Sequence, residues 1–329
     1  MSEDYSNKNV SILNVGNVLV DIEISISNKQ LSEIPIQKGR AIEINSDELT
    51  FYLSKYKSQI TDQYLGGSIF TTAATSSIFE INNLFLGSVG KDNNSKFLID
   101  IMNTYPIKTF LNVDAQNTGC CLIFLTPDKE RTMAACPGAS GQLTLANFTE
   151  TEDYDYVFSD LYSLNSAINK KTISHLLSSN KGLILSLSDI SVMKQHMDFI
   201  KKYSDQIKII AGNEDEVKYL EQAMNTSLIS ASKKNNKIYI VTKGSSGSLI
   251  LHKGIEYVSE AIPAEVTSLN GAGDTFLGAF IGCYMETEDI QYSGNVANYF
   301  SYVSVQQNNA CLKFSSLINT KNAAKAAFL

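Results

Sequence analysis

The stretch NGAGDTFLGAF, Asn270 to Phe280, decides how the rest of this chain is interpreted. It places three small residues and a carboxylate, Gly271 to Asp274, at the beginning of an apolar helical pattern. Small residues there let backbone N–H groups approach an anion closely, and the helix dipole adds positive potential at the same point. A carboxylate beside such an anion site makes chemical sense if it orients and deprotonates a hydroxyl that attacks a phosphoryl group. Alternatively, Asp274 only complements the dipole in the first helical turn.

Six predominantly apolar runs elsewhere in the chain predict the fold class. They cover residues 10–15, 84–89, 156–158, 183–187, 207–211 and 238–242, and helical patterns separate them. Continuous apolar strands that alternate with helices indicate a sheet with both faces covered. We therefore expect an α/β fold, a three-layer αβα sandwich with a mostly parallel sheet. Ligands of such a fold bind beyond the carboxyl ends of the strands, where loops meet helix N-termini.

Two other segments have a different pattern. From Val18 to Ser27 every second residue is apolar, and the residues between them are polar except Leu19, which is typical of a half-exposed strand in an antiparallel sheet. The segment 120–136 predicts a hairpin of the same kind. We infer a small, discontinuous β layer, formed from about 17–45 and 112–136, that is inserted in the larger sandwich.

The chain is acidic and has few arginines. Its 329 residues contain 27 Lys and Arg against 34 Asp and Glu, which gives a net charge of −7, and Arg40 and Arg131 are the two arginines. A protein that binds nucleic acid or an anionic membrane normally has a basic face, so neither partner is expected. An arginine-lined polyanion site is also excluded, and any phosphate must be held by other groups.

Length and residue usage fit an ordinary globular protein with one large α/β domain or two smaller ones. Hydrophobic residues make up 43% of the chain and charged residues 19%, which are usual values. No apolar run approaches the roughly 18 residues of a membrane-spanning helix, and the start lacks an apolar signal sequence, so we expect a cytoplasmic protein. The five cysteines have no CxxC spacing, which predicts reduced thiols without a disulfide or a structural metal.

NGAGDTFLGAF is one of several motifs that occur in the order of a known family. GNVLVDIE (16–23), GGSIFTTAA (66–74), NEDE (213–216) and VTKGSSG (241–247) accompany it. Together these segments resemble the PfkB carbohydrate kinases, also called the ribokinase and adenosine kinase family, over roughly residues 10 to 310. The resemblance implies a ribokinase-like fold in which the small β layer is a lid, and an enzyme that uses ATP and Mg²⁺. P-loop, HExxH and GxSxG motifs are absent from the sequence.

The resemblance also implies roles for individual residues of the acceptor site. Asp274 is the catalytic base. Charge on the transferred phosphoryl group is held by the amides of Gly271, Ala272 and Gly273. The acceptor is bound by Asn17, Asp21, Gly66, Gly67, Thr71 and Arg131. Considered without the family, Asp21 is a solvated strand residue and Arg131 a surface residue.

The nucleotide site follows from the same resemblance. ATP is contacted by Asn213, Thr242, Gly244, Gly247 and Asn298, and Mg²⁺ lies near Asn213 and Glu216, bound through water. Asn213 and Glu216 are three residues apart at the beginning of a predicted helix, so they share one face and also suit a helix cap. Considered alone, Asn298 fits a solvated helix residue almost as well.

Two positions depart from the family pattern. Thr71 replaces the asparagine that commonly touches the acceptor, which changes the hydroxyls that this position can recognise. Thr267, Ser268 and Leu269 stand where the family has an aspartate that helps bind a monovalent cation behind the anion site. The second departure argues against activation by a monovalent cation.

The resemblance is strongest to the adenosine-kinase-like branch, through GNVLVDIE (16–23) and DKERTM (128–133). It predicts a single kinase domain over 1–329 that phosphorylates a hydroxyl of a nucleoside or a ribose-type sugar. Ribokinase-like or 2-keto-3-deoxygluconate-like activity is one alternative, and a catalytically weak sensor of nucleosides or sugars is another. Exposed edges of the lid often pair in this family, so a homodimer through the lid is a further expectation.

Overall fold

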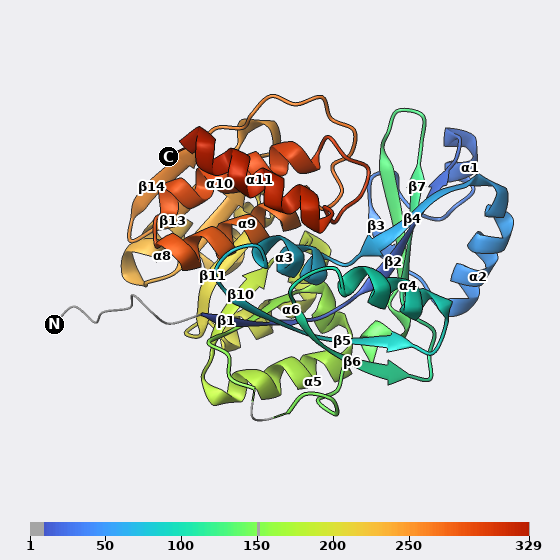
Figure 1. The fold of residues 1–329 in the computed structure, drawn as a ribbon, viewed down its shortest axis with the longest axis horizontal. Helices are drawn as coiled ribbons and strands as arrows, with labels where there is room; N and C mark the ends of the chain where they lie inside the picture. Colours follow the sequence, from blue (N-terminus) through green and yellow to red (C-terminus); the bar gives the residue numbers. More distant parts are fainter. Residues whose placement is uncertain (1–9, 150–151, 329) are drawn as a thin grey trace.

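The computed structural model describes residues 10–149 and 152–328, and its centre is a nine-stranded sheet (Figure 1). The strands of this sheet are β1 (Ser11–Val15), β5 (Asn82–Gly90), β6 (Lys108–Asp114), β9 (Tyr156–Asp160), β10 (Gly182–Ser186), β11 (Ile207–Asn213), β12 (Ile238–Thr242), β13 (Ser248–His252) and β14 (Ile255–Ser259). Their order is β14-β13-β12-β11-β10-β9-β1-β5-β6. The pairs β12–β13 and β13–β14 are antiparallel and the other pairs are parallel. All six predicted strands lie here, so the α/β fold with a mostly parallel sheet is confirmed.

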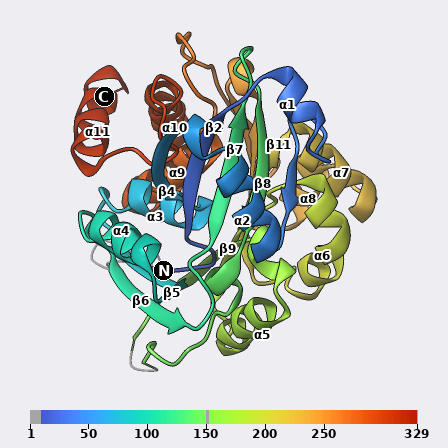
Figure 2. The same cartoon turned by 90° about the vertical axis from the view of Figure 1, so that its right-hand side faces the viewer.

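Helices cover both faces of this large sheet and make it the middle of three layers (Figure 2). One face carries α3 (Ser68–Ser76), α4 (Asn93–Met102), α9 (Ala272–Thr287), α10 (Ile290–Ser304) and α11 (Phe314–Phe328). The other carries α5 (Ala167–Leu176), α6 (Ile190–Lys202), α7 (Glu214–Met224) and α8 (Leu228–Lys234). Neighbouring residues of one strand face different layers, since Ile12 packs in the apolar cluster of α3 and α9 and Leu13 in that of α5 and α6. This two-sided burial explains the predominantly apolar runs.

A second, five-stranded sheet lies beside the first, at the right of Figure 1. It contains β2 (Leu19–Ser25), β3 (Ala41–Glu43), β4 (Ile60–Gly66), β7 (Cys120–Leu125) and β8 (Arg131–Cys136), in the order β3-β8-β7-β2-β4. Its outer face is covered by α1 (Asn28–Ser32) and α2 (Ser46–Lys55). Val20, Ile22 and Ile24 pack there with Leu31 and Tyr52. Within the described ranges, none of the helices is both long and apolar enough to cross a membrane.

The small sheet is mixed, so the prediction of an antiparallel sheet is wrong for two of its pairs. β2–β4 and β7–β8 are antiparallel, whereas β2–β7 and β3–β8 are parallel. The chain between β2 and β7 passes through the large sheet, and so long a connection permits parallel pairing. The sheet also includes β4 at residues 60–66, beyond the expected segment 17–45.

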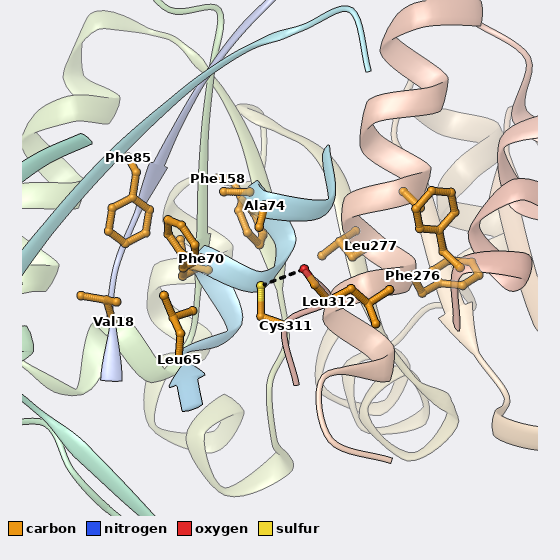
Figure 3. Close-up of a cluster of buried hydrophobic side chains, with 14 of the residues drawn as sticks. Val18, Leu65, Phe70, Ala74, Phe85, Phe158, Phe276, Leu277, Cys311 and Leu312 are labelled. Atoms are coloured by element: carbon orange, nitrogen blue, oxygen red, sulfur yellow. Dashed lines mark hydrogen bonds between the residues drawn. The ribbon is translucent and has the colours of Figure 1, made fainter. Parts of the chain in front are cut away.

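α3 and α9 pack against each other at the centre of the molecule. Figure 3 shows Phe70 of α3 and Leu277 of α9 in one apolar cluster. A Cβ added to Gly278 of α9 would lie 2.4 Å from the carbonyl oxygen of Thr72 on α3. The Thr72 hydroxyl also donates a hydrogen bond to the carbonyl of Asp274 at 3.2 Å. The first turn of α9 is therefore fixed against α3, and position 278 requires a residue without a Cβ.

We expect Gly278→Ala to lower the free energy of unfolding by about 1–3 kcal/mol, because the added methyl group must push α3 and α9 apart. Urea unfolding followed by circular dichroism measures this difference. Gly273→Ala is the matched control, since a Cβ there has no atom within 4 Å and alanine suits a helix better than glycine. Equal destabilisation by both substitutions would contradict the packing argument.

Candidate functional site

A cavity of about 240 Å³ lies at the carboxyl ends of β10, β11 and β12, where they meet the beginning of α9. Five of the predicted site residues line it: Asn213, Glu216, Thr242, Gly273 and Asp274. Three segments that are far apart in the chain thus meet at the strand ends, which is where this fold class binds ligands. Gly271 and Ala272 directly precede Gly273 in the sequence, but they do not line the cavity.

Asp274 belongs to the first turn of α9. The N-cap of this helix is Gly271, whose φ of 72° is left-handed. A Cβ on Gly271 would lie 2.3 Å from the carbonyl oxygen of Ala310, so only glycine fits there. Because the first N–H groups of a helix lack helical partners, this turn offers hydrogen-bond donors and positive potential to an anion.

The carboxyl group of Asp274 is held in an environment that disfavours its charge. Burial raises its pKa to about 7; the neighbouring Asp160 and Glu216 carboxylates also raise the pKa, and the Ser68 side chain lowers it. Asp160 ends β9, is buried, and accepts a hydrogen bond from the Ser163 backbone N–H at 2.7 Å. Burial raises the pKa of Asp160 as well. A carboxylate whose pKa lies near neutrality is suited to accept a proton.

Asn213 and Glu216 form a capping box at the beginning of α7. The Glu216 backbone N–H donates to the Asn213 side chain at 3.0 Å. The Glu216 carboxylate accepts from the backbone and side-chain N–H groups of Asn213 at 2.9 and 2.7 Å. Burial is the main cause that raises the Glu216 pKa. The pair caps the helix and lines the cavity at once, so the two interpretations of this motif are compatible.

Three of the predicted nucleotide residues, Thr242, Gly244 and Gly247, lie at the end of β12 and in the turn that follows it. Thr242 lines the cavity, and Gly244, with a φ of 52°, has open space where a Cβ would be. A Cβ on Gly247 would lie 2.1 Å from the carbonyl oxygen of Ser259, so this turn packs tightly on the end of β14. Asn298 is buried and donates its amide to the same Ser259 oxygen at 2.8 Å. Its interpretation as a solvated helix residue is therefore wrong.

Asp21 lies on β2 and has only 6% of its surface exposed, so the interpretation as a solvated strand residue is wrong. A Cβ on Gly66 would overlap the Asp21 carboxylate, which explains glycine at this position. Asn270 donates its side-chain amide to Asp21 at 3.4 Å and links the small sheet to the segment before α9. Burial raises the Asp21 pKa to about 7, Asn270 and Arg131 lower it, and Asp274 raises it.

The remaining predicted acceptor residues are distributed around this point. Gly67, with a φ of 103°, is the N-cap of α3 and packs on the carbonyl of Asn17. Asn17 lines a second cavity of about 390 Å³ between β3, β8 and the beginning of α5. Arg131 on β8 lies near enough to Asp21 to lower its pKa. Thr71 is buried inside α3 and lines neither cavity.

Several residues of the site were not predicted from the sequence. Those that line the first cavity or act on Asp274 are Ser68, Asp160, Tyr162, Ser186 and Ser188. Asp160, Ser186 and Ser188 are polar residues at or just after the end of a predicted parallel strand, which is a usable signal for this fold class. Asn270 stands inside the quoted motif but received no role of its own. Tyr64, in the middle of β4, carries no such signal.

The sequence matches the pfkB family of carbohydrate kinases over residues 41–316. An adenosine kinase from Dictyostelium discoideum is 24% identical over 335 residues, which cover 93% of this chain and 98% of that protein. A deoxyribokinase from Salmonella typhimurium is 23% identical over 256 residues, 73% of this chain and 81% of that protein. The curated relatives therefore include kinases of both nucleosides and sugars.

Solved structures share the fold. A probable sugar kinase protein from Rhizobium etli superimposes with a TM-score of 0.85, 21% identity and coverage of 98% of this chain and 100% of that one. The adenosine kinase from Sinorhizobium meliloti gives a TM-score of 0.83, 19% identity and coverage of 97% and 100%. The predicted ribokinase-like fold and phosphotransferase class are thus confirmed. The chain belongs to the pfkB family of carbohydrate kinases.

Proposed function

We propose that the protein transfers the γ-phosphoryl group of ATP to a primary hydroxyl of a nucleoside, with adenosine as the leading acceptor. The observation that carries this proposal is the meeting of Asp274, Glu216 and Thr242 in one cavity at the beginning of α9. A carboxylate of raised pKa at a helix N-terminus combines a base with an anion site, and phosphoryl transfer needs both.

Asp274 would orient the acceptor hydroxyl and take up its proton as the oxygen attacks the γ-phosphorus. Its pKa of about 7 leaves a large share of the groups ionised, and therefore active, at neutral pH. The amides of Gly271, Ala272 and Gly273 would stabilise the negative charge on the phosphoryl group during its transfer, and the α9 dipole would add to this stabilisation. Positioning and electrostatics supply most of the catalysis in such a transfer.

The nucleotide would lie on the turn after β12, where Thr242 and Gly244 leave backbone exposed. Asn298 would act indirectly, because it holds the Ser259 carbonyl on which Gly247 packs. Its amide therefore positions the turn rather than the adenine ring. The monovalent-cation site of the family is not part of this proposal, since Ser268 is buried and its hydroxyl accepts the Asn270 N–H at 3.1 Å.

The oxygen donors around the cavity fit Mg²⁺ carried by the nucleotide. Glu216 and Asp274 present carboxylates and Asn213 an amide, and Mg²⁺ commonly keeps most of its waters while using one or two carboxylates. In residues 10–149 and 152–328, no group of three or more His, Cys, Asp or Glu could hold a metal independently of a ligand. Mg²⁺, when bound, neutralises charge on the phosphates; Asn213 and Glu216 would hold it through water.

The acceptor would bind between the small sheet and the beginning of α3. Asp21, for which Gly66 leaves room, would accept hydrogen bonds from the hydroxyls of the acceptor, and the backbone of Gly66 and Gly67 would lie beside it. The face of the small sheet around Asp21 is apolar, with contacts among Leu19, Tyr64, Cys121, Ile123, Met133 and Ala135. An apolar wall with a few polar groups favours a nucleoside with a flat base over a free sugar. The adenosine kinases among the relatives support the same acceptor.

The proposal also covers the role of the small sheet, the oligomeric state and the cellular location of the enzyme. The small sheet would act as a lid that closes over the acceptor and excludes water, within a single domain over 1–329. A homodimer through the lid edges is part of the proposal. The five cysteines, all within the described residues, are free thiols, which suits the cytoplasm. With a net charge of −7, neither nucleic acid nor membrane is a proposed partner.

Asp274→Asn should lower kcat at least about 10²-fold, because the base is lost while the shape remains. ATP binding, measured by calorimetry, should stay nearly intact. The Asp274 pKa is raised in the folded protein from its ordinary value of 3.8 to about 7, so the group lowers the free energy of unfolding as the pH rises between these two values and has its full destabilising effect above pH 7. The variant should therefore melt at the same or a higher temperature at pH 8. Turnover close to wild type would refute the role of base.

The pH profile of kcat/KM should rise about tenfold per pH unit below about pH 7 and level off above it, because the Asp274 carboxylate must be ionised. Asp160→Asn should move the midpoint to lower pH, since it removes a neighbouring negative charge but keeps an oxygen for the Ser163 N–H. Asp198→Asn, at an exposed position on α6, is the control. An unchanged midpoint in Asp160→Asn would contradict the assignment.

A coupled assay of ADP release tests the acceptor directly. The panel comprises adenosine, other nucleosides, ribose, fructose 6-phosphate and ketodeoxy sugar acids. We expect the highest kcat/KM with adenosine, because a base can pack on the apolar face of the small sheet. A preference for free ribose or a ketodeoxy acid would assign a sugar kinase instead. Saturable binding of an acceptor without turnover would indicate a sensor.

A further inference from the structure

Tyr64 lies directly opposite Asp21 in the β2–β4 pair. Paired residues of an antiparallel sheet point to the same face, so the phenol and the carboxylate share the face proposed to meet the acceptor. The ring packs with Cys121 and Ile123 of the small sheet and with Ala310 of the segment between α10 and α11. Tyr64 thus stands at the junction between the small sheet and the segment against which Gly271 packs.

The Tyr64 hydroxyl is buried, and no described residue reaches it with the geometry of a hydrogen bond, although the Asn270 amide lies close enough to lower its pKa. The whole residue has 5% of its surface exposed. A buried polar group without a partner costs free energy, so a ligand that supplies the partner gains affinity at this point. A strand residue whose only task was packing could be phenylalanine without this cost.

The groups around the hydroxyl define what that ligand must offer. Burial, Asp21 and Glu23 raise the pKa of Tyr64, whereas Arg131 and the nearby Asn270 amide lower it. The phenol therefore stays protonated and can donate its hydrogen. Beside it, Asp21 can accept. One donor and one acceptor side by side match a hydroxyl group, which accepts and donates at once.

Resting on the proposed function, we infer that Tyr64 is a specificity-determining residue that donates to the acceptor hydroxyl from which Asp21 accepts. An entering hydroxyl replaces the Asn270 amide at Asp21, which is a long contact of 3.4 Å and therefore easily displaced. The same hydroxyl then accepts a hydrogen bond from the Tyr64 hydroxyl. An acceptor without that hydroxyl leaves Tyr64 unpaired and leaves Asp21 with only its long contact to Asn270, so the site discriminates against it.

Thr71 does not supply a competing donor. Like the Tyr64 hydroxyl, the Thr71 hydroxyl is buried, lacks a partner among the described residues and lines neither cavity, but it is not placed opposite Asp21 in the sheet. The Thr71 side chain instead lies near Cys311, whose thiol pKa it lowers. We therefore expect Asp21 and Tyr64 of the small sheet, and not a side chain of α3, to recognise this hydroxyl of the acceptor.

The test compares acceptors that differ by one hydroxyl. In wild type and in Tyr64→Phe, kcat/KM is measured for adenosine, 2′-deoxyadenosine and 3′-deoxyadenosine, and for D-ribose and 2-deoxy-D-ribose. Phenylalanine keeps the ring contacts with Cys121 and Ile123, so the variant should fold. We expect the preference of wild type for the hydroxylated acceptor over at least one deoxy analogue to fall about 10-fold or more in the variant. Calorimetry measures the same preference in binding.

Tyr56→Phe is the matched control. Tyr56 also has a buried hydroxyl without a partner in the described residues, but it packs on Phe124 at the outer face of the small sheet. Its substitution should leave the preference unchanged. An unchanged preference in Tyr64→Phe, or an equal loss in Tyr56→Phe, would overturn the inference. If wild type uses ribose but not adenosine, the proposed acceptor fails while the ribose pair still tests Tyr64. If neither pair binds, both proposals fail.

Discussion

The contact between the beginnings of α3 and α9 is the constraint on which the site depends. Gly67 and Gly271, both with positive φ, are the N-caps of the two helices, and Gly278 lies on the Thr72 carbonyl where they pack. Because the two N-termini converge, the turn at Gly66 and Gly67 and the Asp274 carboxyl group lie in one region of positive potential. Glycine at these three positions allows backbone groups of neighbouring segments to approach one another more closely than any side chain would permit.

The converging helix ends also explain how an acidic chain can handle phosphate. Asp21, Asp160, Glu216 and Asp274 gather in or near the site, and burial raises the pKa of each. Such a group of carboxylates destabilises the fold and repels a free anion. Helix dipoles and exposed N–H groups offset part of this repulsion, and a nucleotide that carries its own cation offsets more. The scarcity of arginine therefore excludes polyanions such as nucleic acid but not a single nucleotide.

The strands of the large sheet could be predicted because a strand that is buried on both faces consists mostly of apolar residues, and this feature is visible within each short run. The parallel pairing of β2 with β7 could not, because it depends on the path of about a hundred intervening residues through the other sheet. Burial of Asp21 and the partners of Asn298 were missed for a similar reason. Each depends on a distant segment, the Asn270 amide in one case and the Ser259 carbonyl in the other. Motif residues on their own strand or helix end were found; residues that act across the junction of the two sheets were not.

Residue 310 connects these two parts of the molecule. Ala310 packs with Tyr64 of the small sheet, and its carbonyl lies where a Cβ of Gly271 would be. The next residues, Cys311 and Leu312, pack between α3 and α9 (Figure 3). Movement of the small sheet away from this segment would separate Tyr64 from Ala310 and Asp21 from Asn270 together, so the acceptor side and the anion site would lose contact at the same time. Since packed interfaces move as units rather than by gradual deformation, the small sheet and the beginning of α9 are connected both through this segment and through the contact between Asp21 and Asn270.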